Sequence, residues 1–251
     1  MSENRKFSVL MSVYVKENPA FLEEAVESII HQTLKPSEVV IVEDGPLTPE
    51  LYQVLEKLEA QSSIPIKRCP LEQNRGLGLA LQYGVLQCQY DVIARMDTDD
   101  IAVEDRFEQQ FELMEKENLD LLGGHIAEFI DQPDEIVSYR RVPTKHEDII
   151  AYQRMRSAFN HMTVMFKRKM VLKAGNYEDG LYMEDDLLWL NMISAGARTG
   201  NVDQILCKVR VGAGMFERRG GLRYLKLYRQ ARQRMHARGQ ISYGEYLKSV
   251  L

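Results

Sequence analysis

The sequence predicts an α/β fold with a mostly parallel central sheet flanked by helices. Short apolar runs alternate with amphipathic stretches through the first half of the chain, as expected for strands joined by right-handed helical crossovers. Two of these runs end abruptly in acidic residues, at Glu43-Asp44 and at Asp97-Thr98-Asp99-Asp100. Because ligands bind at the carboxyl ends of parallel strands, the same pattern predicts where a functional site lies.

The elements of the first half follow from short apolar runs, which predict buried strands, and from amphipathic stretches with a 3.6-residue repeat, which predict helices. The first strand is expected over residues 7–14. Asn18 and Pro19 suit the N-cap and the first position of the helix that follows it. Later strands are expected over residues 38–42, 64–68 and 90–96, and helices over residues 47–61, 79–87 and 104–118.

The second half has thinner patterns, but its elements can still be placed. Strands are expected over residues 119–129, 136–142 and 160–166, and helices over residues 146–155 and 184–195, with a short helix after Lys167. Residues 131–134 form the expected turn between the first two strands. No linker, repeat or low-complexity segment interrupts the chain, which indicates one continuous domain.

Composition excludes several classes of protein. The 251 residues carry a net charge of -5, which argues against general nucleic-acid binding. Three widely spaced cysteines without a C-x-x-C pair suggest neither a zinc site nor a disulfide framework, and they fit a reducing cytoplasm. No apolar run approaches the roughly 18 residues that span a bilayer, and the amino terminus lacks a signal-peptide pattern.

The acids after the 90–96 strand have two interpretations. Asp is a poor strand former, so the strand should stop and leave Asp97, Asp99 and Asp100 at its carboxyl end. Clustered carboxylates repel one another unless a cation neutralises them, and Mg²⁺ and Mn²⁺ prefer oxygen ligands. The alternative is a solvated turn that caps the helix near Asp105. We favour a metal site, because a capping turn needs one acid rather than three.

A second acidic cluster, Glu184-Asp185-Asp186, lies at the start of a predicted amphipathic helix. Acids at a helix start complement its dipole, so capping is one interpretation. A carboxylate without a ligand at the rim of a cleft could instead take a proton from a hydroxyl group. Both interpretations stay open on these residues alone.

The turn Asn74-Arg75-Gly76-Leu77-Gly78 precedes a helix and could hold phosphate on free backbone N–H groups, although a simple turn explains it equally well. The first strand is not followed by G-x-G-x-x-G, and the sequence contains no P-loop. This lowers the expectation of a dinucleotide oxidoreductase or a P-loop NTPase.

Taken in order, these segments resemble a family 2 glycosyltransferase of the glycosyltransferase-A, or nucleotide-diphospho-sugar transferase, fold. The matching segments are residues 8–14, 28–33, 40–45, 74–78, 94–100 and 184–189. Each is weak alone, but the ordered set is specific. The similarity is greatest to bacterial transferases that build capsular or exopolysaccharide repeat units.

The resemblance implies a nucleotide-sugar site at the matching positions. Asp44 would accept a hydrogen bond from the base, expected to be uracil, in a pocket that the end of the first strand also lines. The residues assigned to this site are Ser12, Val13, Tyr14, Asp44, Asn74, Arg75, Gly76, Arg95, Asp97, Thr98, His161, Arg218 and Arg219. A lone histidine such as His161 is more often a structural hydrogen-bonding residue, and that alternative stays open.

The same resemblance implies the metal and the chemistry. Asp99 would ligate Mg²⁺ or Mn²⁺ that bridges the two phosphates, with Asp97 and Asp100 as further ligands. The metal would offset charge on the departing nucleotide diphosphate. Asp185 would be the general base, and Glu184 would position the sugar or the acceptor. The implied reaction inverts the anomeric carbon in one displacement and moves a hexose from a UDP-sugar to a hydroxyl of a saccharide acceptor.

The carboxyl terminus adds two features. Arg218 and Arg219 lie between glycines and could close over a diphosphate, although a solvated loop is equally consistent. Residues 222–238 form a predicted basic amphipathic helix. Its apolar face comprises Tyr224, Leu227, Tyr228, Ala231 and Met235, and its remaining surface carries Arg223, Lys226, Arg229, Arg232, Arg234 and Arg238. Such a helix packs on the domain or rests on the inner face of the cell membrane. The second arrangement suits a polyprenyl-diphosphate-linked acceptor, which the family resemblance implies.

The expected organisation is a catalytic domain over residues 1–219 and a helical extension over residues 220–251. Within the catalytic domain, residues 1–118 would bind nucleotide and residues 119–219 would face the acceptor. Two other functions remain as alternatives: a non-catalytic nucleotide-sugar-binding module and a metal-dependent phosphatase. The phosphatase is less favoured, because its acid pair would be expected after the first strand rather than the fourth.

Overall fold

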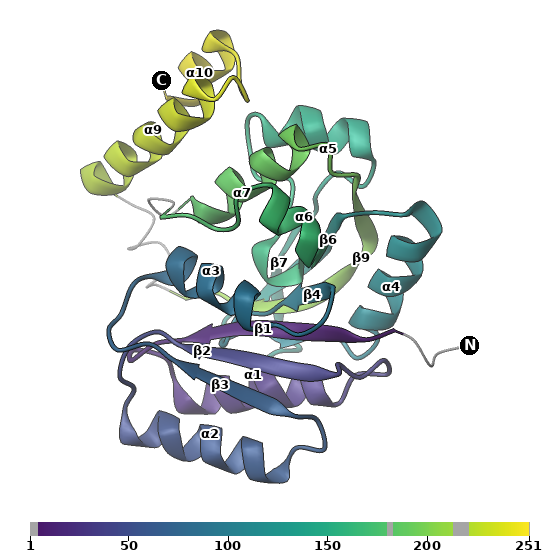
Figure 1. Cartoon of the computed structure of the whole chain (residues 1–251), viewed down its shortest axis with the longest axis vertical. Coiled ribbons are helices and arrows are strands. Elements are labelled where there is room, and N and C mark those ends of the chain that lie inside the picture. Colours follow the sequence, from purple (N-terminus) through teal and green to yellow (C-terminus); the bar gives the residue numbers. More distant parts are fainter. Residues whose placement is uncertain (1–4, 180–182, 213–220, 251) are drawn as a thin grey trace.

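The computed structural model describes residues 5–179, 183–212 and 221–250. Its strands are β1 (Phe7–Val13), β2 (Glu38–Glu43), β3 (Ile66–Pro70), β4 (Val92–Arg95), β5 (Ile101–Ala102), β6 (Leu121–Phe129), β7 (Ile136–Arg140), β8 (Met165–Lys167) and β9 (Thr199–Arg210). Its helices are α1 (Pro19–Ile30), α2 (Pro49–Gln61), α3 (Leu77–Gln87), α4 (Arg106–Glu117), α5 (His146–Gln153), α6 (Arg168–Lys173), α7 (Glu184–Ser194), α9 (Gly221–Ala237) and α10 (Tyr243–Val250), with a 3-10 turn η1 (His161–Thr163). These elements build the predicted α/β fold (Figure 1).

All the strands join one sheet in the order β3-β2-β1-β4-β8-β6-β9-β5, and β7 pairs with β6 beside this path. The four strands β3, β2, β1 and β4 are mutually parallel, so their carboxyl ends meet at one edge. Beyond β4 the sheet is mixed, because β8 runs antiparallel between β4 and β6 whereas β6 and β9 are parallel. The parallel half therefore gathers the loops that carry Asp44 and Asp97.

Helices cover both faces of the sheet. Side chains of successive β1 residues point to opposite faces, so Val9 and Met11 pack with α1, α2 and α4, whereas Leu10 packs with α3 and α7. Asn18 caps α1 as predicted, since its side chain accepts a 2.9 Å hydrogen bond from the Ala20 N–H, and Pro19 begins the helix. Both core layers consist of apolar side chains that are almost fully buried.

Some predicted boundaries were wrong for local reasons. Strand β3 begins two residues later than expected, because the Ser62 hydroxyl bonds both the N–H and the carbonyl of Ile64 and holds a turn there. Of the strand expected over residues 160–166, only the last two residues form a strand, as part of β8. Its first part forms η1, where the Thr163 hydroxyl and N–H both donate to the Asn160 carbonyl.

Strand β9 was not predicted, although it is the longest strand at twelve residues. Its sequence lacks alternation because Asp203 and Gln204 are exposed where β9 shifts register against Gly124 and His125 of β6. Bulges of this kind place consecutive residues on the same face of a sheet. The two-residue strand β5, which pairs with β9, was also missed.

The last two helices form a pair that packs on α7 at one end of the molecule (Figure 1). The helix predicted over residues 222–238 is present as α9, but its buried face is narrower than expected. Of the five predicted apolar positions, Ala231 and Met235 are buried. Arg232, which was assigned to the polar surface, is also buried, and its guanidinium donates to the Arg154 carbonyl and the Ser249 hydroxyl. Across the described residues, no helix is long and apolar enough to span a membrane.

Candidate active site

Three carboxylates converge directly after β4. Oxygens of Asp97, Asp99 and Asp100 all lie within 4.8 Å of one another. Asp97 forms an ion pair with Arg95, and Asp100 accepts a 3.0 Å hydrogen bond from the Arg210 N–H at the end of β9. Asp99 is half-buried and, unlike the other two, is not held by any of these contacts.

Burial and mutual repulsion make this cluster electrostatically unfavourable without a cation. Burial, with the charges of Asp97 and Glu17, raises the pKa of Asp99 to about 7. Burial and the same neighbouring acids raise the pKa of Asp100 well above its ordinary value. Three oxygen donors in a small volume are the ligand set that Mg²⁺ and Mn²⁺ prefer, so these residues fit such an ion.

The acids at the start of α7 divide into two kinds. The Asp186 carboxylate accepts a 2.6 Å hydrogen bond from the Gln153 amide of α5, so it joins the two helices. Asp185 accepts the N–H of Asp186 within its own turn, and among the described residues neither Asp185 nor Glu184 hydrogen bonds to another side chain. Burial raises the pKa of Asp185, and burial with the Asp185 charge raises the pKa of Glu184 to about 7.

Arg95 joins the two acidic clusters. Its side chain is fully buried, and its charge favours the ionised forms of Asp99, Glu184 and Asp185. The Asp97 charge, from the β4 cluster, in turn disfavours ionisation of Glu184. The two clusters are therefore close enough to interact around one guanidinium. The Arg95 Nε and Nη1 atoms are buried and have no hydrogen-bond partner within the described chain.

Asp44 organises the loop that precedes α3. Its two carboxylate oxygens accept hydrogen bonds from the N–H groups of Arg75 and Gly76, at 2.7 and 3.0 Å. Asn74 donates its side-chain amide to the Asp44 carbonyl. Gly45 adopts φ +85°, and a Cβ there would lie 2.6 Å from the Asn74 nitrogen, so only glycine fits this turn. The predicted base-binding carboxylate thus also holds the loop in place.

Helix α3 connects this loop to the acids of α7. A Cβ added to Gly78 would lie 2.5 Å from the Glu178 carbonyl oxygen and 3.0 Å from Glu184 Cβ. The start of α3 therefore packs directly against the residue predicted to position a substrate. Asp44 and the β4 acids thus follow parallel strands that end at one edge of the sheet, and the start of α3, which follows the Asp44 loop, lies against Glu184 of α7.

Several predicted site residues have internal partners. The Thr98 hydroxyl donates to Glu17 and is buried, so it positions that glutamate. His161 hydrogen bonds to the Tyr177 hydroxyl at 2.9 Å, and burial lowers its pKa well below the ordinary value. Val13 accepts the Asp44 N–H and Tyr14 accepts the Glu17 N–H through their carbonyls. The Ser12 carbonyl lies 3.5 Å from the Thr98 hydroxyl. Arg218 and Arg219 lie outside the described residues.

Sequence reasoning missed Glu17 and Tyr177. Glu17 lies in the β1–α1 loop, and its charge helps to raise the pKa of Asp99. Tyr177 hydrogen bonds to His161, and burial, with smaller contributions from the charges of Asp185 and Glu184, raises the pKa of its hydroxyl. A single polar residue in a loop carries no periodic signal. Only the fold shows that these two face the acidic clusters.

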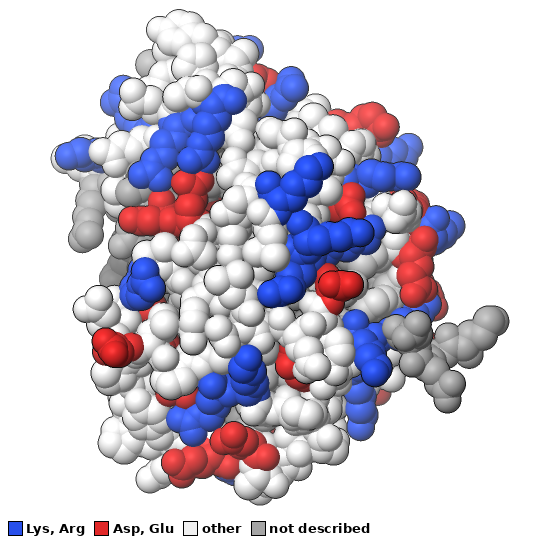
Figure 2. All heavy atoms as spheres, in the orientation of Figure 1, with Lys and Arg blue, Asp and Glu red and all other residues white. Residues whose placement is uncertain are grey.

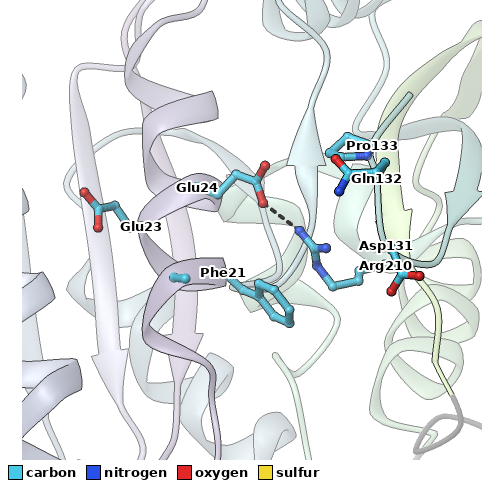
Figure 3. Close-up of a pocket in the computed structure, with 8 residues that line it drawn as sticks. Phe21, Glu23, Glu24, Asp131, Gln132, Pro133 and Arg210 are labelled. Atoms are coloured by element: carbon cyan, nitrogen blue, oxygen red, sulfur yellow. Dashed lines mark hydrogen bonds and ion pairs between the residues drawn. The ribbon is translucent and has the colours of Figure 1, made fainter. Parts of the chain in front are cut away.

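Two cavities of the described chain are lined by residues other than those predicted for the site. A cavity of about 460 Å³ lies between α1 and the 131–133 turn, with Arg210 in its wall (Figure 3). Arg210 stacks on Phe21 at 3.8 Å and pairs with Glu24, so its side chain faces this cavity while its N–H holds Asp100. A second cavity, of about 490 Å³, lies between α4 and α5.

Glu184→Gln should stabilise the protein at pH 8 when divalent cations are absent. The folded pKa of about 7 exceeds the unfolded value of roughly 4.3, so the folded chain binds more protons between these values. The free energy of unfolding therefore falls as the pH rises from about 4.3 towards 7. Above pH 7 the ionised, buried Glu184 destabilises the folded wild type by the full amount. Thermal melts should show a higher Tm for the variant at pH 8 and a smaller difference at pH 5. Glu72→Gln, at an exposed position, should not show this pattern.

Comparison with known proteins gives consistent matches. The Glycosyl transferase family 2 model matches residues 8–175. The amylovoran biosynthesis glycosyltransferase AmsE of Erwinia amylovora is 42% identical over 88% of this chain and 82% of its own length. An Escherichia coli UDP-Gal:alpha-D-GlcNAc-diphosphoundecaprenol beta-1,3-galactosyltransferase is 35% identical over 98% of this chain and 89% of its own.

Solved structures share the fold at low sequence identity. S. aureus TarS 1–349 in complex with UDP-GlcNAc matches with a TM-score of 0.68 and 18% identity, over 92% of this chain and 66% of that one. The mannosyltransferase PcManGT from Pyrobaculum calidifontis, in complex with GDP-Man and Mn²⁺, matches with a TM-score of 0.68 and 15% identity, over 97% and 67%. The chain thus spans about two thirds of these longer proteins.

Proposed function

This chain belongs to the family 2 glycosyltransferases, and we propose that it transfers a hexose from a UDP-sugar to a hydroxyl of a lipid-linked saccharide. The reaction would serve the synthesis of a bacterial surface polysaccharide. One observation carries the proposal: a cation-suited acid cluster and a separate pair of acids, Glu184 and Asp185, both interact electrostatically with the buried Arg95. A site that only binds a sugar nucleotide would not need the second pair.

The proposed donor and acceptor rest on relatives. The E. coli relative is named for UDP-Gal and for a GlcNAc-diphosphoundecaprenol acceptor, and it matches nearly the whole chain. The similar TarS structure holds UDP-GlcNAc. Asp44 follows the end of β2, and its carboxylate accepts the N–H groups of Arg75 and Gly76. The uridine would lie beside this carboxylate. Residues 1–118 would thus bind the nucleotide and residues 119–219 the acceptor.

Each acid has a distinct part in the proposed reaction. Asp99, Asp97 and Asp100 would hold Mn²⁺ or Mg²⁺, which would offset the charge of the departing UDP. Asp185 would take the proton of the acceptor hydroxyl as that oxygen attacks the anomeric carbon from the side opposite UDP, so the configuration inverts. Burial raises the Asp185 pKa, which makes it a stronger base than an exposed aspartate.

A panel of nucleotide sugars tests this function. UDP-galactose, UDP-glucose, UDP-GlcNAc and GDP-mannose should each be incubated with the chain, Mn²⁺ and GlcNAc-diphosphoundecaprenol. We expect metal-dependent sugar transfer from one UDP-sugar and inverted configuration in the product. Tight nucleotide binding without transfer or donor hydrolysis would favour a non-catalytic module, and release of phosphate from simple phosphomonoesters would favour a phosphatase.

We further propose that α9 rests on the anionic inner face of the cell membrane. Among the described residues of α9, Leu222 and Leu225 are exposed, at 86% and 46%, and Lys226 and Arg229 are exposed beside them without an ion pair. The sequence of α9 contains no acid. Figure 2 shows basic side chains gathered over this helix. Exposed leucines beside unpaired cations suit the interface of an anionic bilayer.

Replacing Lys226 and Arg229 by Glu should weaken binding to phosphatidylglycerol vesicles. Each basic residue near such a surface contributes about 1 kcal/mol, or roughly fivefold in partitioning, and the added acids would also repel lipid. Vesicle co-sedimentation measures the change. The double variant Lys35→Glu/Lys169→Glu alters charge equally at exposed positions elsewhere and should bind as the wild type does. Equal losses in both variants would indicate a general charge effect.

A further inference from the structure

We infer that Arg234, in the last turn of α9, and Arg238, directly after this helix, are positioning residues for the carboxylates of α7 and act through the 176–179 segment. This inference rests on the proposed function, because it concerns how Glu184 and Asp185 are held for transfer. It gives the C-terminal helix a role in the reaction itself, separate from contact with a membrane.

The contact begins with a fork of hydrogen bonds. Arg238 Nη1 and Nη2 donate to Glu178 Oε1 and Oε2 at 2.5 and 2.9 Å. These bonds lower the pKa of Glu178, as expected for a bidentate pair. Arg234 Nη1 donates to the Asp179 carbonyl at 2.8 Å. In Figure 2 the basic band over α9 borders a group of acidic side chains. Two arginines one turn apart thus hold two consecutive residues.

Residues 235–241, at the end of α9 and directly after it, also contact α7 directly. Arg238 Nη1 and Gln240 Nε2 both donate to Asn191 Oδ1, at 3.4 and 2.7 Å. Met235 and Ile241 pack against Leu187 and Leu190 of α7. The arginines therefore connect the 176–179 segment to a helix pair that is already fixed against the helix bearing the acids.

On its other side the 176–179 segment is fixed to α3. Gln82 Nε2 donates to the Tyr177 carbonyl at 2.6 Å, and Asn176 Nδ2 donates to the Gln82 carbonyl at 3.0 Å. Gly78 contacts both the Glu178 carbonyl and the Glu184 side chain. Because Glu178 and Glu184 meet at the same glycine, a displacement of Glu178 changes the space available to Glu184.

Loss of one guanidinium should leave the fold intact. Arg238 is 38% exposed and Glu178 28% exposed, and partly exposed ion pairs contribute little to global stability. The apolar contact between α9 and α7 does not involve Arg238. A change in turnover without a change in Tm would therefore indicate positioning rather than folding.

The test compares Arg238→Ala, Arg238→Lys and Lys248→Ala in the full chain. The last variant removes an exposed charge from α10 and serves as the matched control. With the UDP-sugar that the panel identifies, GlcNAc-diphosphoundecaprenol and Mn²⁺, Arg238→Ala should lower kcat by roughly tenfold to hundredfold, because small displacements of catalytic groups cost this much. The KM for that UDP-sugar should change by about twofold or less. Arg238→Lys should recover part of the loss, and Lys248→Ala should match the wild type.

Hydrogen exchange provides a readout that does not depend on activity. Amides of residues 183–188 should exchange several-fold faster in Arg238→Ala than in the wild type or in Lys248→Ala. Unchanged exchange overturns the inference whether or not the chain transfers sugar, and so does faster exchange with unchanged kcat. If the wild type transfers no sugar from any donor while exchange responds as expected, the proposed function fails and the contact between α9 and α7 stands.

Discussion

The Asp185→Asn enzyme should bind UDP-sugar and Mn²⁺ as the wild type does but transfer sugar roughly a thousandfold more slowly. Asparagine has nearly the shape of aspartate and can accept the same N–H of Asp186, so α7 should begin as before. The asparagine amide, however, cannot take a proton from a hydroxyl group. Because Asp185 lies outside the cluster of Asp97, Asp99 and Asp100, the loss should appear in kcat and leave donor affinity nearly unchanged.

Asp186→Asn is the matched control, since it removes the neighbouring charge on the same helix. An asparagine side chain can still accept the hydrogen bond from Gln153, so this variant should keep most of its turnover. Initial rates give kcat, and calorimetry with UDP and Mn²⁺ gives binding. Transfer at the wild-type rate by Asp185→Asn would refute the assignment of the base. Equal loss in both variants would point to the packing of α7 rather than to proton transfer.

The parallel half of the fold could be predicted because three of its strands, β1, β2 and β4, are short and buried on both faces. Such strands are near-continuous apolar runs, and each ends where a polar residue can no longer be buried. The ends of β2 and β4 therefore appear in the sequence as Asp44 and Asp97. Since parallel strands end at one edge, sequence alone placed these acids on the same side of the sheet.

The links between the acids could not be predicted in the same way. Arg95 lies inside an apolar strand, and the sequence does not show that its charge acts on the acids of α7, which is remote in sequence. Tyr177 and Glu178 belong to a segment without a periodic pattern, so their contacts with His161 and α9 depend wholly on tertiary packing. The burial of Arg232 could not be predicted either, because a helical pattern assigns arginine to the surface. The Arg154 carbonyl that accepts its hydrogen bond is brought there only by the fold.

Asp99→Asn should abolish tight, metal-dependent donor binding. Loss of a carboxylate from a three-acid cluster removes a ligand and part of the charge that attracts the cation. Because loss of a supporting residue alone weakens metal affinity tenfold to hundredfold, loss of a ligand should cost roughly hundredfold or more. Calorimetric titration of UDP into the wild type and the variant, with and without Mn²⁺, measures this loss of affinity. Asp91→Asn, at the exposed residue directly before β4, should leave binding unchanged.

The wild-type site should also release protons when it binds Mn²⁺. Without a cation the Asp99 pKa is about 7, so near neutral pH a proton competes with the metal for this carboxylate. Metal affinity should therefore fall as the pH is lowered from 8 to 6, and calorimetry in buffers of different ionisation enthalpy should detect the released protons. In Asp99→Asn this pH dependence should largely disappear along with binding. Affinity for Mn²⁺ that is constant from pH 6 to 8 would show that Asp99 is not the competing group, and the metal would then have to be assigned to other ligands.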